Sequence, residues 1–473
     1  MNARETSTRV KVAVAVAAGR LAGSASRLAG KGGGTSLPGL VAQRIAPDIV
    51  TTLAAALPRG SIVVAGTNGK TTTAAMLSAV LRANELEPIH NSAGANLLRG
   101  VASSLLARAA PSGRLRVTPA SIGLFEGDEA ALGAIVAAVK PTVVVVTNLF
   151  RDQLDRYGEL DAIAVRWRAA FAALPPTAAL VLNADDPLVA SLGEGAGRPV
   201  VYYGLDLPTG RFTTPPESAD SVSCRRCGTL LAYQAVYYGH LGRYLCPRCG
   251  WGRPPIDVSG RAVTARGLDG ALVEAAVASR VVNVDLRVPG LYNVYNALAA
   301  LAAARALSLD LDRAATALTG VTPAFGRAEK LSVAGREVWL LLVKNPTGAD
   351  EVLHLLHDAG GPLDLLVVLN DNAADGHDVS WIWDVAVEDV ASLIGSASFS
   401  GTRGDDMALR FKYAGAAVDD AVVTRDPVAA LDSALTRGDA ARPLYVVATY
   451  TAMLALRRGL VARGIVRHYL DEE

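Results

Sequence analysis

Short apolar runs alternate with longer amphipathic segments through most of the chain. The runs at 61–65, 141–147 and 179–182 consist mainly of Val, Ile, Leu, Ala and Thr, which is typical of strands buried on both faces of a parallel sheet. The segments at 72–83 and 161–174 have the length and pattern of helices. Strands and helices in alternation predict βαβ units and therefore a doubly wound α/β sheet.

The same pattern suggests how the chain is divided. Residues 1–48 are Ala-rich and helical in character, and a change of pattern near 325–332 separates the first sheet from a second set of strands and helices. The second set has apolar runs at 338–343, 363–369 and 444–448. We expect a helical lead-in (1–48), a central domain (49–328) and a smaller, Rossmann-like α/β C-terminal domain (329–473).

Composition excludes several classes of protein. Apolar residues make up 51% of the 473 residues and charged ones 19%, so the chain is neither disordered nor fibrous. Its 46 basic and 45 acidic residues argue against a nucleic-acid partner that depends on bulk positive charge. No apolar run approaches the roughly 18 residues of a membrane span, and no convincing signal-peptide cleavage site follows the N-terminal segment. We therefore expect a cytoplasmic protein.

A glycine-containing loop, GTNGKTTT at 66–73, lies where a predicted strand turns into a helix. Such loops direct backbone N–H groups at phosphate oxygens, while the lysine reaches the β- and γ-phosphates and the next hydroxyl binds Mg²⁺. Lys70 is one of only seven lysines, and Thr71 follows it. Val64 stands where the general pattern has glycine, so the match is to a variant. The loop predicts ATP or GTP binding, the alternative being a simple glycine turn.

The four cysteines all fall within 26 residues. They form two Cys-x-x-Cys pairs separated by 18 residues, each followed by glycine (Cys224, Cys227, Cys246 and Cys249). This spacing predicts a zinc ribbon at about 220–255, with a structural Zn²⁺ held by four thiolates. Two disulfides or an iron–sulfur centre are the alternatives. Nearby arginines (225, 226, 243 and 248) also allow a nucleic-acid-binding ribbon.

Four segments together resemble the Mur ligase family, in the same order along the chain. They are GTNGKTT (66–72), TNLFRDQLDRYGE (147–159), LNADDP (182–187) and GLYNVYNALAA (290–300). Members of this family phosphorylate a carboxylate with ATP and let an amine attack the acyl phosphate. The resemblance covers about 50–330 as the central ATPase domain and 330–473 as the smaller C-terminal domain.

The resemblance implies a role for each matching residue. Glu126 falls where the family has its Mg²⁺ carboxylate, with Asp128 and Glu129 as near competitors, and Arg327 matches an arginine near the transferring phosphate. The implied nucleotide-binding residues are Gly66, Thr67, Asn68, Gly69, Lys70, Thr71, Thr72, Asn183, Asp185, Asp186, Asn293 and Asn296. Asn293 and Asn296 would read adenine, whereas Asn183, Asp185 and Asp186 would either bind ribose or organise their loop.

Two departures from the family pattern concern metal binding. Gln153 and Tyr157 stand in the stretch where the family has histidines. No lysine occurs at 165–171, where many members carry a modified lysine that holds a second metal ion. A second Mg²⁺ held in the usual way is therefore left open.

The cysteine insertion and the short N-terminal part narrow the resemblance to one branch of the family, the synthetase subunit of an enzyme that amidates lipid II. That branch converts the α-carboxylate of D-glutamate in the stem peptide to D-isoglutamine, with ammonia from a separate, GatD-like glutaminase subunit. Glutamine hydrolysis of the common type needs a Cys nucleophile and a His base. All four cysteines here have metal-ligand spacing, which independently indicates that another chain hydrolyses glutamine.

The C-terminal part has two further features. Lys344-Asn-Pro346 resembles the HNP stretch of Mur ligases, with Lys in place of His. The segment 369–384 holds four Asp and two Trp after a predicted strand. The resemblance implies that one aspartate, Asp384 or Asp378, completes a triad with the partner's Cys and His. Trp381 and Trp383 at i and i+2 would share a strand face and anchor an interface, or else pack in the core.

We therefore expect ATP, Mg²⁺ and a structural Zn²⁺ as cofactors, lipid II as substrate and a glutaminase as partner. We expect no nucleic-acid partner. We expect at most a peripheral association of the protein with the inner face of the plasma membrane. The alternatives are a Mur- or folylpolyglutamate-type amino-acid ligase and a zinc-ribbon nucleic-acid-binding ATPase.

Overall fold

A computed structural model describes residues 3–28, 36–91, 95–151, 160–216, 219–322, 327–418 and 423–466. Its largest element is a nine-stranded sheet with the order β11-β10-β9-β6-β5-β4-β1-β3-β2. The strands are β1 Ser61–Ala65, β2 Glu87–His90, β3 Ser121–Gly127, β4 Val143–Val146, β5 Ala179–Asn183, β6 Val200–Leu205, β9 Val258–Ala265, β10 Ala271–Val277 and β11 Arg280–Leu286. Neighbours from β2 to β9 are parallel, and β9, β10 and β11 are antiparallel.

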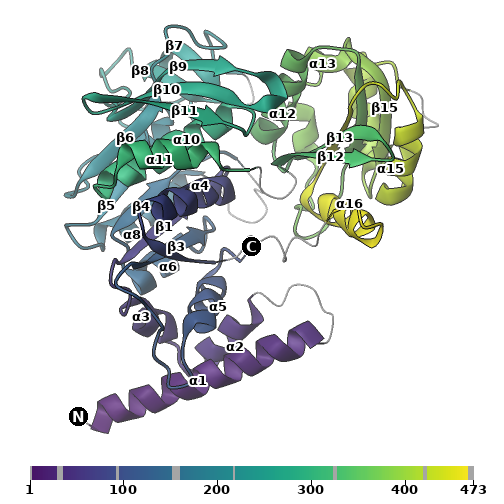
Figure 1. Ribbon diagram of the computed structural model, residues 1–473. Helices are drawn as coiled ribbons and strands as arrows, with labels where there is room; N and C mark the ends of the chain where they lie inside the picture. Colours follow the sequence, from purple (N-terminus) through teal and green to yellow (C-terminus); the bar gives the residue numbers. More distant parts are fainter. Residues whose placement is uncertain are drawn as a thin grey trace.

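Helices cover both faces of this sheet (Figure 1). Because side chains alternate along a strand, Ile62 and Val64 of β1 enter one core while Val63 and Ala65 enter the other. The first core includes α4 Lys70–Ala83, α10 Leu291–Ala306 and α11 Leu311–Thr319. The second includes α1 Ala3–Leu28, α2 Leu37–Ile45, α3 Ile49–Ala54, α5 Leu98–Arg108, α6 Leu132–Val139, α8 Leu160–Ala172 and α9 Pro187–Ser191. The sheet is therefore doubly wound.

The insertion after β6 contains a two-stranded antiparallel sheet, β7 Ala232–Tyr238 and β8 Leu241–Leu245. The chain then returns to β9, which pairs directly with β6. A 3₁₀ turn, η1 Gly267–Asp269, separates β9 from β10. The insertion therefore leaves the order of the large sheet undisturbed.

A second sheet of six strands has the order β12-β13-β17-β14-β15-β16. Its strands are β12 Arg327–Val333, β13 Arg336–Leu342, β14 Leu363–Val368, β15 Ile394–Ser400, β16 Val423–Thr424 and β17 Leu444–Ala448. Its helices are α12 Pro346–Ala359, α13 Glu388–Ala391, α14 Gly404–Tyr413, α15 Pro427–Thr436 and α16 Tyr450–Ala462, with the 3₁₀ turn η2 Ser380–Asp384. All its pairs are parallel except β12–β13, and an apolar core lies on each of its faces.

The predicted α/β character and most predicted elements agree with the structure to within a few residues. The helix expected from 72 begins at Lys70, and the strand expected over 141–147 is shorter, at Val143–Val146. Within the described residues, no helix is both long and apolar enough to cross a membrane.

Candidate active site

The loop at 66–69 joins β1 to α4 and requires glycine at both ends. Gly66 and Gly69 have φ values of 135° and 83°, which side chains with a Cβ rarely adopt. A Cβ on Gly66 would lie 2.1 Å from Thr147 Oγ1, and one on Gly69 would lie 2.2 Å from Asn296 Oδ1. Both positions therefore exclude larger residues.

The segment that follows β4 fixes the conformation of this loop. The backbone N–H of Thr67 donates to Asn148 O at 3.0 Å, and that of Asn68 donates to Asn148 Oδ1 at 2.8 Å. The Thr67 hydroxyl donates to Phe150 O and accepts from Phe150 N, both at 3.1 Å. The loop and the segment after β4 consequently form one hydrogen-bonded unit.

Two lysines from different parts of the chain meet at this loop. Lys70, at the start of α4, is buried and donates to Gly66 O and, at 3.2 Å, to Thr67 O. Lys344, which follows β13 in the second sheet, donates to the same Thr67 O at 3.0 Å. The loop thus concentrates two positive charges, one from each sheet domain.

Glu129 is the nearest counter-charge. Its Oε2 lies 3.4 Å from Lys70 Nζ. Burial by itself favours the neutral acid, but the charges of Lys70 and Lys344 outweigh burial and lower the pKa of Glu129. Glu129 is therefore an ionised partner of the two lysines.

Thr71, in the first turn of α4, and Glu126, near the end of β3, lie together beside the same loop. The Thr71 hydroxyl donates to Glu126 Oε2 at 2.9 Å. The other oxygen, Oε1, lies 3.5 Å from His90 Nε2 at the end of β2. Among the described residues, neither Glu126 Oε1 nor His90 Nε2 has a hydrogen-bond partner. A hydroxyl and a carboxylate with an unsatisfied buried oxygen form a donor set that fits Mg²⁺.

Asn183 ends β5, Asp185 and Asp186 follow it, and all three are completely buried. Asn183 donates to Thr147 O at 3.0 Å. Asp185 accepts from Leu205 N, Tyr295 Oη and Arg253 Nη1 at 2.7–2.8 Å. Asp186 caps α9 and also accepts from Leu149 N at 2.8 Å. With no side chain exposed, these contacts favour the organising role and speak against direct binding of ribose.

Asn293 and Asn296 lie one helical turn apart near the start of α10 and are both buried. Asn296 donates to Asn293 Oδ1 at 3.0 Å and accepts from the Thr73 hydroxyl at 3.1 Å. Asn293 donates to Pro289 O at 2.7 Å. The pair therefore packs beneath the loop at 66–69 and links it to α10.

A pair of amides joins the loop to the second sheet domain. Asn68 and Asn345 exchange hydrogen bonds at 3.4 and 3.3 Å. Asn345 also caps α12 by accepting from Gly348 N at 2.9 Å. The segment 344–346 thus contacts the loop at 66–69 directly.

Some predicted positions fall outside what the structure describes. Arg327 begins β12, but its side chain is not among the described parts. Gln153 and Tyr157 lie in 152–159, outside the described residues.

Asp384 ends η2 and forms an ion pair with the central domain. Arg151 Nη2 lies 2.6 Å from Asp384 Oδ2, and the Arg151 backbone N–H donates to Asp220 Oδ2 at 2.8 Å. Asp378, the other candidate, is exposed, and hydrogen bonds from the Ser380 side chain and from Ser380 N, the latter at 2.8 Å, lower its pKa. The two aspartates therefore differ: Asp384 connects two domains, and Asp378 caps a local turn.

The expectation that Trp381 and Trp383 share a strand face is wrong. Both lie in the 3₁₀ turn η2, where residues two apart point in different directions. Trp381 packs on the core of the second sheet domain, and Trp383 is half exposed with its ring against Tyr413.

The four cysteine sulfurs lie within 4.8 Å of one another, and none forms a disulfide. Four thiolates around a tetrahedral Zn²⁺ would be about 3.8 Å apart. The two Cys-x-x-Cys turns have equivalent hydrogen bonds. In the first turn, Cys224 O accepts from Gly228 N and Cys224 N donates to Thr229 O. In the second turn, Cys246 O accepts from Gly250 N and Cys246 N donates to Trp251 O. The cluster could therefore hold one metal ion between two matching turns.

The insertion docks on the segments that support the loop at 66–69. His240, in the turn between β7 and β8, is fully buried, with Nε2 3.4 Å from Asp186 Oδ2 and its ring 4.7 Å from Phe150. Arg253 pairs with Asp185 at 2.8 Å. Burial raises the pKa of Asp185 even with Arg253 beside it.

Sequence reasoning missed Arg151, His90 and His240 as residues of this region. Arg151 belongs to a motif segment, but its partner Asp384 is 233 residues away, and nothing local indicates the pair. His240 is inside the insertion, where only the cysteines had a recognisable spacing.

Comparisons with known proteins agree with this geometry. The Mur ligase middle domain family matches residues 64–214, and the MurT ligase C-terminal family matches residues 342–453. Among solved structures, a pseudomurein peptide ligase type C from Methanothermus fervidus has a TM-score of 0.65 at 23% identity, covering 85% of this chain and 79% of that one. MurF from Acinetobacter baumannii has a TM-score of 0.62 at 18% identity, covering 87% and 79%. These likenesses show the Mur ligase fold.

Curated relatives are similar over more of the chain. A Streptococcus pneumoniae protein named lipid II isoglutaminyl synthase (glutamine-hydrolyzing) subunit MurT is 34% identical over 457 residues, which cover 96% of this chain and 98% of that one. The protein of the same name from Staphylococcus aureus strain COL is 33% identical over 398 residues, covering 84% and 86%. With this identity along almost its whole length, the chain belongs to the MurT family of Mur ligases.

Proposed function

We propose that this chain is the synthetase subunit of a lipid II isoglutaminyl synthase. It would use ATP to amidate the α-carboxylate of D-glutamate in the stem peptide, giving D-isoglutamine. The observation that carries the proposal is the 34% identity to a MurT subunit over 96% of the chain, combined with a loop in which two lysines meet. The domain boundaries proposed for this function stay at 1–48, 49–328 and 329–473, with the ribbon at about 220–255.

The loop at 66–72 would bind the phosphates of ATP. The glycine constraint at Gly66 and Gly69 supports this, because a backbone held this closely leaves no side chain between N–H groups and a ligand. Thr71 and Glu126 would hold Mg²⁺, which when bound neutralises phosphate charge. Asn293 and Asn296 would support the nucleotide-binding loop from below. The family resemblance implies that they also recognise adenine.

The chemistry would proceed in two steps. A carboxylate oxygen attacks the γ-phosphorus as the bond to the β-phosphate oxygen breaks, which gives an acyl phosphate and ADP. Ammonia then attacks the acyl carbon, and inorganic phosphate leaves with the bonding electrons as the nitrogen loses a proton. Lys70 and Lys344 would stabilise charge on the transferring phosphoryl group, and Arg327 is proposed to join them.

A GatD-like glutaminase would supply the ammonia. All four cysteines lie in one cluster, so no thiol remains as a nucleophile for glutamine hydrolysis in this chain. Asp384 is our first candidate for the aspartate that orients the partner's histidine, because it is partly exposed and has a cationic partner. Asp378 is the second candidate. In the complex, Asp384→Asn should abolish glutamine-dependent but not ammonium-dependent amidation, and Asp378→Asn should change neither.

The cysteine cluster would hold a structural zinc ion in a ribbon. Its sulfurs leave no open coordination position for chemistry. Its role would be to stabilise the insertion, which in turn contacts Asp185 and Asp186 beneath the active-site segment. Because the substrate is lipid-linked, we place the enzyme at the inner face of the plasma membrane.

Product mass tests the proposal. The chain is incubated with ATP, Mg²⁺, detergent-solubilised lipid II and ammonium chloride, or with candidate amino acids in place of ammonium. We expect a mass decrease of about 1 Da, from acid to amide, and no turnover with glutamine until a glutaminase is added. A gain of an amino-acid residue would instead identify a Mur- or folylpolyglutamate-type ligase. ATP hydrolysis stimulated only by nucleic acid would favour the ribbon ATPase.

A further inference from the structure

The N-terminal helix α1 has two apolar faces, and only one of them is packed. Its inner face, with Val12, Ala15 and Val16, is buried in the core shared with α2 and α5. On the opposite face, Val10, Val14 and Leu21 are 58%, 52% and 72% exposed. Successive residues are rotated by about 100°, so these three side chains fall within a sector of about 40°. With the exposed Ala17 between Val14 and Leu21, the helix therefore presents an apolar stripe to solvent.

Basic side chains border this stripe. By the same rotation, Lys11 and Arg20 lie about 90° to either side of it, and both are exposed. Arg9 is exposed on the same side of the helix as Arg20, three turns earlier, at about 1.5 Å of rise per residue. An apolar stripe between basic flanks is the arrangement of a helix that lies in the plane of a membrane surface, with its cations at the lipid head groups.

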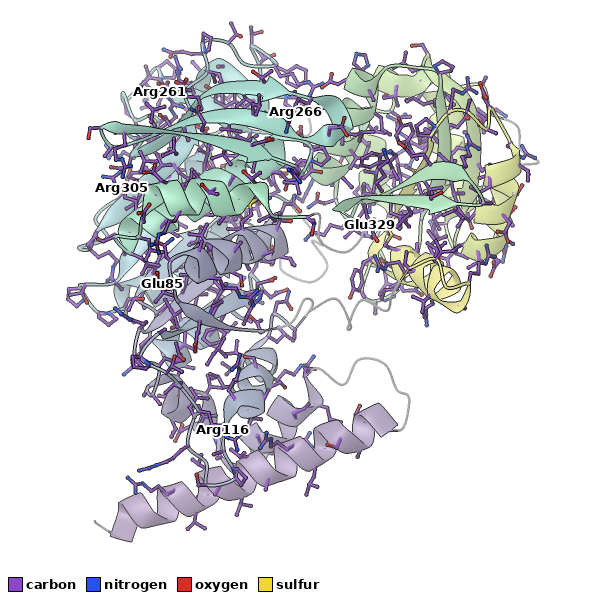
Figure 2. The ribbon with its side chains drawn as sticks, in the orientation of Figure 1. Glu85, Arg116, Arg261, Arg266, Arg305 and Glu329 are labelled. Atoms are coloured by element: carbon purple, nitrogen blue, oxygen red, sulfur yellow. The ribbon has the colours of Figure 1, made fainter. Side chains whose placement is uncertain are left out.

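The surroundings of α1 are also basic. The turn at 110–113 packs on α1, since a Cβ on Gly113 would lie 3.0 Å from Ala13 N. Arg108, Arg114 and Arg116 beside this turn are exposed, and Figure 2 shows Arg116 next to α1. Figure 1 shows α1 at the end of the molecule farthest from β7 and β8.

The near-zero net charge conceals a strong asymmetry. Residues 1–120 contain 14 Lys and Arg but only 4 Asp and Glu, whereas residues 121–473 contain 32 and 41. The formal charge is therefore +10 in the first part and −9 in the second. Such a charge distribution would orient the molecule, with the α1 end toward an anionic surface.

We propose that the exposed face of α1 docks on the surface of an anionic phospholipid bilayer. The proposal rests on the proposed function, since a lipid-linked substrate gives the enzyme a reason to work at that surface. It names a part of the chain that the chemistry does not use. The helix would lie on the bilayer without spanning it, and would hold the catalytic domains beside the lipid-linked muropeptide.

Vesicle flotation of the full chain tests this. The probes are vesicles of phosphatidylglycerol and phosphatidylcholine, compared with phosphatidylcholine alone. We expect the wild type to float with anionic vesicles and to be released as NaCl rises from 50 to 500 mM. A Val14→Glu/Leu21→Glu variant should bind at least tenfold more weakly, and Leu409→Glu, an exposed leucine on α14, should bind like the wild type.

Other outcomes would overturn the proposal. The double variant floating as the wild type does would exclude α1 as the docking face, as would a wild type that binds neither vesicle. Light scattering measures the oligomeric state of both proteins. A dimeric wild type and a monomeric double variant would assign the stripe to contact with a second copy of the chain. Ammonium-dependent amidation of lipid II in detergent should be unchanged in the variant, so that failure of the catalytic proposal and failure of docking are told apart.

Discussion

Arg151 Nη2 lies 2.6 Å from Asp384 Oδ2, and this ion pair connects the segment after β4 with the end of η2 in the other sheet domain. The residue before it, Phe150, exchanges two hydrogen bonds with Thr67 of the loop at 66–69. A short series of direct contacts therefore runs from the proposed ATP site to the proposed glutaminase-facing aspartate.

Arg151→Ala in the complex should lower glutamine-dependent amidation at least tenfold more than ammonium-dependent amidation. The Arg151 guanidinium holds the Asp384 carboxylate in one orientation, and orienting partners affect activity by about 10–100-fold. Arg151→Lys should restore part of the loss in the glutamine-dependent reaction. Equal losses with both nitrogen donors would show that Arg151 only stabilises the fold.

Lys344→Met should reduce the rate of amidation about 10²–10³-fold with either ammonium or glutamine. The amine reaches Thr67 O from the second sheet domain, and loss of one preorganised charge at a transferring group has an effect of this size. Steady-state rates and the thermal midpoint are measured together. Lys330→Met is the matched control, because Lys330 pairs with Glu337 at the surface; an equal loss in both variants would contradict the assignment.

Gly69→Ala should abolish nucleotide binding, whereas Gly195→Ala should not. Both glycines have positive φ, so both variants carry backbone strain. Only at Gly69 would the new Cβ collide with a side chain, Asn296 Oδ1 at 2.2 Å, because Gly195 has no atom within 4 Å. Calorimetric titration with a non-hydrolysable ATP analogue distinguishes the two effects. Similar affinity loss at both positions would mean that strain alone, and not packing beneath the loop, is responsible.

One zinc ion per chain is expected by elemental analysis, and Cys227→Ser should remove it and lower the thermal midpoint. Metal binding to four thiolates contributes directly to folding free energy, and two of the cysteines belong to the small apolar cluster of the insertion. Arg248→Ala, between the second pair of cysteines, should retain the metal. Visible absorbance with bound iron would instead indicate an iron–sulfur centre.

Asp350→Asn should stabilise the protein at pH 7.5 and have less effect at pH 4.5. Burial raises the pKa of Asp350 to about 6, while its carboxylate accepts from Ala386 N at 2.8 Å. An acid whose pKa is raised on folding holds its proton more tightly in the folded state, so stability is lost as pH rises from about 4 through 6. The full difference would be at most about 3 kcal/mol. Urea midpoints at the two pH values measure it, and a pH-independent difference would contradict it.

The sequence predicted the parts that depend on local pattern. Buried apolar runs located β4, β5 and β17, and the glycine and lysine spacing located the loop at 66–70, because these features need only neighbours along the chain. The cysteine spacing likewise indicated the cluster.

The features that the sequence did not predict depend on contacts between segments far apart along the chain. Nothing near Arg151 indicates Asp384, and nothing near Asp186 indicates that His240 lies beside it. The spacing of Trp381 and Trp383 led to a wrong prediction, because residues i and i+2 lie on the same face of a strand but point in different directions in a 3₁₀ turn. The basic end of the molecule was hidden because charges were summed over the whole chain.

The direct pairing of β6 with β9 has an evolutionary consequence. A chain passing straight from Leu205 to Val258 would keep the same sheet, so the insertion between them can be acquired without rearranging its host. Removing the insertion, however, would remove contacts beside the active site. Without Arg253, Asp185 would lose its ion-pair partner, at about 3–5 kcal/mol for a broken buried pair. The strand order is therefore independent of the insertion, whereas the charge balance beside β5 depends on it.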